Sequence, residues 1–175
     1  MINERIKAAR ESILAEWLRL ILETYPPDAR GFLGNQRNRF LNPIGAELRR
    51  DTTVVFDVLA GDAPGEKLAV AVDNLIAVRA VQDFTPSQAV AIFYLLKDAV
   101  RVSIAPTLID APALHELANW EKNIDLVVLR AFDAYMARRD KLYEIKANNL
   151  KRQSFMLQQR SGIMAGADDD GENGK

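Results

Sequence analysis

The feature that most constrains this chain is a long, unbroken helical stretch near its C-terminal end. After Pro112 there is no proline or glycine up to Gln158, and apolar side chains recur at every seventh position. These residues are Leu129, Met136, Tyr143, Leu150 and Leu157. A helix over 112–158 would be about 70 Å long, whereas a domain of this size needs only about 30 Å of helix to cross it. We therefore expect the distal half to project, to fold back or to pair with another chain.

The rest of the sequence predicts four shorter helices that pack with the long one in a compact all-α bundle of about five helices. Apolar residues at three- and four-residue steps mark the buried faces, and prolines, glycines and N-capping residues mark the ends. No segment shows the sustained apolar–polar alternation of a strand, so we expect no sheet. The strongest local signal is the capping box Thr85-Pro86-Ser87-Gln88. The predicted helices are 3–24, 43–60, 64–82 and 86–102.

Composition limits the classes of protein to which this chain can belong. It has 175 residues, of which 49% are hydrophobic and 27% are charged, which fits one globular domain. The net charge of −1 gives no overall attraction to nucleic acid. The absence of cysteine excludes disulfides and thiolate metal sites. The N-terminus lacks the apolar core of a signal peptide, and the most apolar run, 89–96, is too short to span a bilayer, so we expect a cytoplasmic protein.

Three stretches of the chain share the pattern of a known family. The middle stretch reads Arg-Ala-Val-Gln-Asp-Phe-Thr-Pro-Ser-Gln at 79–88 and is the most specific. Together the stretches cover much of 10–150, and they resemble the N-terminal domain family of RsbT co-antagonist proteins, the RsbRD type of stress-signalling sensor domain. The matching segments are 17–26 with 39–45, 76–89, and 131–136 with 139–145.

The resemblance implies a small all-α input domain, here over 1–160, with a globin-like arrangement of helices that holds no haem and forms dimers. Such domains usually precede an output module such as a STAS domain or a kinase. Only about fifteen residues follow the last predicted helix, and we predict that 161–175 form a disordered acidic tail. We therefore expect no output domain in this chain, and a separate protein partner that carries the output function.

A polar cluster precedes the capped turn and is the first candidate site. Arg79, Gln82 and Asp83 lie within five residues, and together they could hold a small anion or the backbone of a partner. Alternatively, Gln82 and Asp83 bond to helix ends while Arg79 pairs with a carboxylate. We favour this structural role, because buried polar clusters at helix junctions commonly serve stability.

The distal half of the long helix is the second candidate site. Tyr143, Leu150 and Leu157 form one apolar line, whereas a self-sufficient coiled coil needs two. We expect Leu129 and Met136 to pack on the bundle, and the other three residues to form a dimer or partner interface. Seven basic residues accompany two acidic ones between 138 and 160; we interpret them as the solvated exterior of a coiled coil rather than a nucleic-acid or membrane surface.

Signals for catalysis and for cofactors are weak. The single histidine, His115, has no second histidine or cysteine to complete a metal site, and no phosphate-binding loop or nucleophile elbow is present. We expect no catalytic, cofactor-binding or metal-binding residue. Several aromatic residues can line a ligand cavity, although at helical spacing they more often form core. They are Trp17, Phe84, Phe93, Tyr94, Trp120, Phe132 and Tyr135.

These observations predict a non-enzymatic regulatory or sensory module that acts through protein–protein contact and is a homodimer. A structural adaptor of a larger cytoplasmic assembly is the main alternative, and a globin-like carrier of haem or another cofactor is a third. We expect neither nucleic-acid binding nor membrane insertion. A ligand-induced change in the last helix would separate a sensor from an adaptor.

Overall fold

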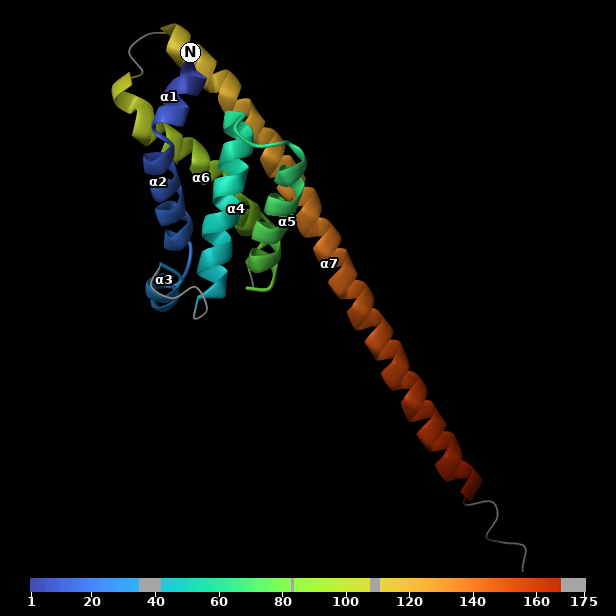
Figure 1. Ribbon diagram of the computed structural model, residues 1–175. Helices are drawn as coiled ribbons and strands as arrows, with labels where there is room; N and C mark the ends of the chain where they lie inside the picture. The colour runs from blue at the N-terminus through green and yellow to red at the C-terminus, as the bar shows by residue number, and fades with distance from the viewer. Residues whose placement is uncertain (35–41, 83, 108–110, 168–175) are drawn as a thin grey trace, which may run out of the picture. The chain divides into compact units, whose positions relative to one another are not determined.

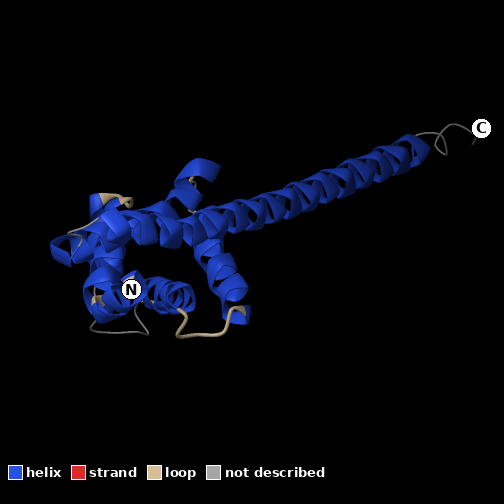
Figure 2. Ribbon diagram, turned by 90° about the horizontal axis from the view of Figure 1, so that it is seen from above, coloured by secondary structure: helices blue, strands red, loops and turns tan. Residues whose placement is uncertain are grey.

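The computed structural model describes residues 1–34, 42–82, 84–107 and 111–167, with side chains as far as Leu157. Within these residues there are seven α-helices, one 3-10 helix and no strand (Figure 2). The predicted all-α class is therefore confirmed. The elements are α1 (Ile2–Ala8), α2 (Arg10–Glu23), α3 (Pro27–Gly34), α4 (Pro43–Ala60), α5 (Glu66–Ala80), α6 (Pro86–Ile104), the 3-10 helix η1 (Ala105–Thr107) and α7 (Ala111–Ala167).

The chain divides into two compact units, Met1–Met136 and Ala137–Lys175. In the first unit, α4 packs beside α5 and α2 packs beside α6 (Figure 1). The indole of Trp17 is fully buried, and its Nε1 donates a hydrogen bond to the carbonyl oxygen of Ile92 at 2.8 Å. Other large, fully buried residues around it include Ile13, Ile21, Leu48, Phe56, Leu75, Ile76, Phe93 and Leu96.

The first part of α7 belongs to the first unit and completes its core. Its buried side chains follow three- and four-residue steps, as expected for one face of a helix. Two ion pairs join it to α6: Lys97 with Asp125 at 2.5 Å, and Arg101 with the buried Glu121 at 2.6 Å. The buried apolar face is formed by Ala113, Leu117, Trp120, Ile124, Val127, Val128, Ala131 and Tyr135.

Local capping chemistry sets the boundaries that the sequence predicted best. The amide of Gly45 donates to Oδ1 of Asn42 at 2.8 Å, so Asn42 caps α4 as predicted. Gly61 ends the same helix with a φ of 82°, a left-handed conformation that glycine adopts without strain. Thr85 and Gln88 form the predicted capping box at the start of α6.

The described residues contain more helices than the predicted five, because two segments differ from expectation. The predicted helix 3–24 is broken at Ala9, whose φ and ψ are −92° and 10°; nothing in the local sequence explains this break, since alanine favours helix. The segment Pro27–Gly34 is helical rather than a loop. Proline ends the preceding helix at this point, but it is also favoured in the first turn of the next helix.

The long helix was predicted correctly in its start but not in its length. It begins at Ala111 and continues beyond Gln158 to Ala167, while residues 168–175 of the predicted tail lie outside the described residues. Met136 packs against the core as expected. Leu129 does not, because 63% of its surface is exposed. Among the described residues, no helix combines the length and the hydropathy needed to cross a membrane.

Candidate functional site

Arg79, the central residue of the predicted polar site, lies in the last turn of α5 and is fully buried. Its Nη1 donates to Oγ1 of Thr24 at 2.8 Å, and its Nη2 donates to the carbonyl oxygen of Gln88 at 3.0 Å. Thr24 follows the end of α2, and its hydroxyl also donates to the carbonyl oxygen of Ile21 at 2.7 Å. One guanidinium group therefore joins the end of α2 to the first turn of α6.

Two aromatic rings enclose the same guanidinium group. Its Cζ lies 3.6 Å from the ring centre of Phe84 and 5.1 Å from that of Tyr25. The two rings meet edge to face, with centres 5.4 Å apart and planes at 83°. The hydroxyl of Tyr135, on α7, donates to the carbonyl oxygen of Phe84 at 3.0 Å. Cation–π contacts of this kind favour a buried positive charge where water is excluded.

The electrostatics of this cluster are unusual for a buried arginine. No carboxylate of the described residues forms an ion pair with Arg79, and burial lowers the pKa of its guanidinium. Within the same part of the chain, three buried polar atoms have no hydrogen-bond partner: Nε of Arg79, Oη of Tyr25 and Oε1 of Gln82. Asp83, the third residue of the predicted site, lies outside the described residues. The contacts of Arg79 favour its structural role at a helix junction.

The predicted interface residues belong to the second unit and have a different environment. The exposed fractions of Tyr143, Leu150 and Leu157 are 56%, 66% and 66%. The guanidinium of Arg139 donates to the Tyr143 hydroxyl at 3.0 Å from Nη2, and its Cζ lies 5.4 Å from the ring centre. Further exposed apolar residues lie around the same helix, namely Leu142, Ile145, Phe155 and Met156.

Comparison with known families explains this combination of a buried junction and an exposed helix. The family described as the RsbT co-antagonist protein rsbRD N-terminal domain matches residues 11–150, which is most of the chain. The chain belongs to this family. No STAS domain was found within the 175 residues. No curated protein and no solved structure matches the chain.

RsbRD N-terminal domains are stressosome-related sensory and regulatory domains, and they are not a known catalytic family. The chemistry of this member gives no sign of a metal centre. His115 is exposed near the start of α7, and within the described ranges no three His, Cys, Asp or Glu side chains are grouped so that they could hold a metal ion. The family implies protein partners of the stressosome.

A groove of about 690 Å³ lies on the first unit of this RsbRD N-terminal domain, between α4, α5 and the first part of α7. None of the seven aromatic residues considered for a ligand cavity lines it. Trp17 and Phe93 are core residues instead, with exposed fractions of 0% and 1%. The groove is lined by Val58, Leu59, Leu68, Asn123, Leu126, Val127, Leu129, Arg130 and Asp133.

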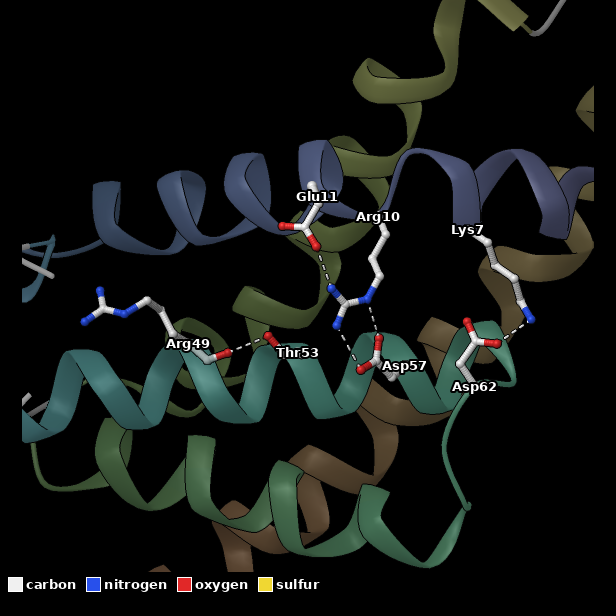
Figure 3. Close-up of polar contacts among 7 residues, drawn as sticks. All are labelled: Lys7, Arg10, Glu11, Arg49, Thr53, Asp57 and Asp62. Atoms are coloured by element: carbon white, nitrogen blue, oxygen red, sulfur yellow. Dashed lines mark hydrogen bonds and ion pairs between the residues drawn. The ribbon is translucent and has the colours of Figure 1, made fainter.

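Ion pairs on the opposite side of α4 hold the first two helices of the domain in place (Figure 3). Arg10 donates to both carboxylate oxygens of Asp57, at 2.8 and 3.0 Å, and also contacts Glu11. Lys7 pairs with Asp62 at 2.5 Å, just beyond the end of α4. The sequence offered no signal for these pairs, because their partners lie about fifty residues apart. Their chemistry is structural, since each cation is matched by a carboxylate.

Tyr25 gives a pH-dependent test of the buried junction. Burial raises the pKa of its phenol above the ordinary value of 10.0. The neutral phenol is thus favoured in the folded state, and its stabilisation is present below pH 10 and lost as the pH rises through the folded pKa. We expect urea unfolding to show a larger loss of stability between pH 8 and pH 10.5 for the wild type than for Tyr25→Phe. Equal losses in the two proteins would contradict this account.

At pH 8 the same substitution should be well tolerated. The hydroxyl of Tyr25 has no hydrogen-bond partner among the described residues, so removing it relieves the cost of burying an unpaired polar group. We expect Tyr25→Phe to change the free energy of unfolding by no more than about 1 kcal/mol, and in the stabilising direction.

Proposed function

We propose that this RsbRD N-terminal domain is a non-enzymatic sensory module that acts through protein contact, and that residues 137–157 of α7, here called the distal segment, form its dimer or partner interface. The observation that supports this most strongly is the exposure of Tyr143, Leu150 and Leu157 at seven-residue spacing. Burying a leucine side chain contributes roughly 1.5–3 kcal/mol, so a partner that covers this line gains substantial free energy.

The proposed signal requires two states of the domain that differ in their affinity for the partner. α7 supplies residues to both units: Trp120 and Ile124 are buried in the first, and Leu150 is exposed in the second. A ligand or partner that binds one packing of the first unit better than another would shift the population of α7 conformations. The distal segment would then present its apolar line differently to the output protein.

Placing a charge in the apolar line tests the proposal. We expect Leu150→Asp and Leu157→Asp to keep the far-ultraviolet circular dichroism and melting temperature of the wild type, because both side chains are already exposed in the free chain. We also expect both to lose association, measured by light scattering for self-association and by pull-down from the native cell for other partners.

The matched control is Asn148→Asp, which adds the same charge to an exposed residue on the opposite face of the helix. It should associate as the wild type does. The proposal fails if Leu150→Asp and Leu157→Asp retain all association seen with the control.

A further inference from the structure

We propose that the distal segment binds a second copy of itself in the antiparallel direction, with Glu144 of each chain beside Lys151 of the other. This inference rests on the proposed function, and it names the partner and the register of the same interface. All residues from 141 to 157 are exposed in the free chain, so the whole surface is accessible to another molecule.

The distal segment has two parallel lines of side chains that differ in size. The apolar line consists of Tyr143, Leu150 and Leu157, and the small line consists of Ala147 and Ser154. Each small residue lies three residues before one apolar residue and four after another, so the two lines are neighbours on the helix surface. The small line lets a second helix approach closely, which compensates for the absence of a second apolar line.

Only one of the two possible directions packs large side chains on small ones. In an antiparallel pair centred between Ala147 and Leu150, Leu150 of one helix lies opposite Ala147 of the other, and Tyr143 lies opposite Ser154. Twofold symmetry repeats both contacts. A parallel pair would instead place Ala147 opposite Ala147 and leave poorly filled layers between the leucines, which is unfavourable because interfaces gain from close packing.

Charge favours the same direction. Glu144 and Lys151 each follow a residue of the apolar line by one position, so they flank the interface on one side. The antiparallel pair brings Glu144 beside Lys151 at both ends of the contact. A parallel pair would bring Lys146 of one helix beside Lys151 of the other, because residues five apart meet across a parallel seam, and this would place like charges together twice.

Charge reversal tests the pairing. We expect Glu144→Lys and Lys151→Glu, each alone, to raise the dissociation constant of the dimer about tenfold, since each creates two like-charge contacts. The double variant should recover the wild-type constant. An equimolar mixture of the two single variants should form a heterodimer as tight as the wild-type dimer, because the mixed pair restores both opposite-charge contacts.

Arg152→Glu is the matched control, because it makes the same change as Lys151→Glu on the opposite face of the helix and should leave the dissociation constant within about twofold. Cross-linking gives an independent measure of direction, since the natural chain has no cysteine. A mixture of Glu144→Cys and Lys151→Cys should form a disulfide-linked heterodimer on mild oxidation, whereas each variant alone should cross-link far less.

The results separate this inference from the proposed function. Single charge reversals that behave like Arg152→Glu, or cross-linking of Glu144→Cys to itself, would overturn the antiparallel pairing. If the chain is monomeric while Leu150→Asp loses a partner in pull-down, self-pairing is wrong and the interface serves another protein. If Leu150→Asp alters no association at all, the proposed function itself is wrong.

Discussion

Gly45→Ala is expected to lower the free energy of unfolding by about 3 kcal/mol. Gly45 is buried in the first turn of α4, and a Cβ atom at this position would overlap the carbonyl oxygen of Leu33 and the side-chain amide of Asn42. The side-chain amide of Asn42 also donates to the carbonyl oxygens of Phe32 and Leu33 at 2.8 and 2.9 Å. The added methyl group therefore separates α3 from α4 and removes the cap of α4 together.

Gly31→Ala is the control for this prediction, because nothing lies within 4 Å of a Cβ atom at Gly31. Gly31 lies inside α3, so alanine should stabilise the helix by about 0.5–1 kcal/mol. Urea unfolding followed by circular dichroism measures both changes. If the two substitutions have effects of the same sign and size, the close contact at Gly45 is not the cause.

Arg79→Ala is expected to have a comparable effect, a loss of about 3–4 kcal/mol. The substitution leaves a cavity in the core and removes the hydrogen bonds to Thr24 and Gln88. It also removes the cation from the face of the Phe84 ring. Arg79→Lys should lose much of the same stability, because an ammonium group cannot reproduce the planar, two-sided geometry of the guanidinium.

An exposed arginine provides the comparison for Arg79. Arg19 lies on α2 with ion pairs to Glu16 and Glu23, and half of its side chain is exposed. Arg19→Ala should cost no more than about 1 kcal/mol. Chemical unfolding separates the two variants clearly. If Arg79→Ala instead unfolds like the wild type but loses binding of a protein or anion, the polar cluster is a binding site rather than a structural junction.

Sequence-based prediction succeeded where a boundary depends on neighbouring residues. Asn42 and Thr85 cap their helices with side chains that bond three residues ahead, and Gly61 adopts a left-handed conformation, all of which is local chemistry. The junction around Arg79 was located but not understood. Its partner Thr24 lies 55 residues away, and no periodicity or motif links two residues at that separation.

The position of Leu129 shows a different limit. A strict seven-residue repeat drifts by about 20° per heptad around a straight helix, so membership of one heptad line does not fix which face is buried. In the first part of α7 the core face follows Trp120, Ile124 and Ala131, and Leu129 lies off that face with 63% of its surface exposed. The repeat therefore identified exposed apolar residues in the distal segment, but it did not identify the residues of α7 that pack in the core.

The two tryptophans of this chain, Trp17 and Trp120, are both buried in the unit Met1–Met136, and residues 137–175 contain none. Intrinsic fluorescence therefore reports the unfolding of the first unit alone, whereas circular dichroism at 222 nm also records the helix of the second. In a denaturant titration, any separation between the two curves measures how independently the distal helix melts. Without a label, the natural chain thus reports whether its two units form one cooperative system.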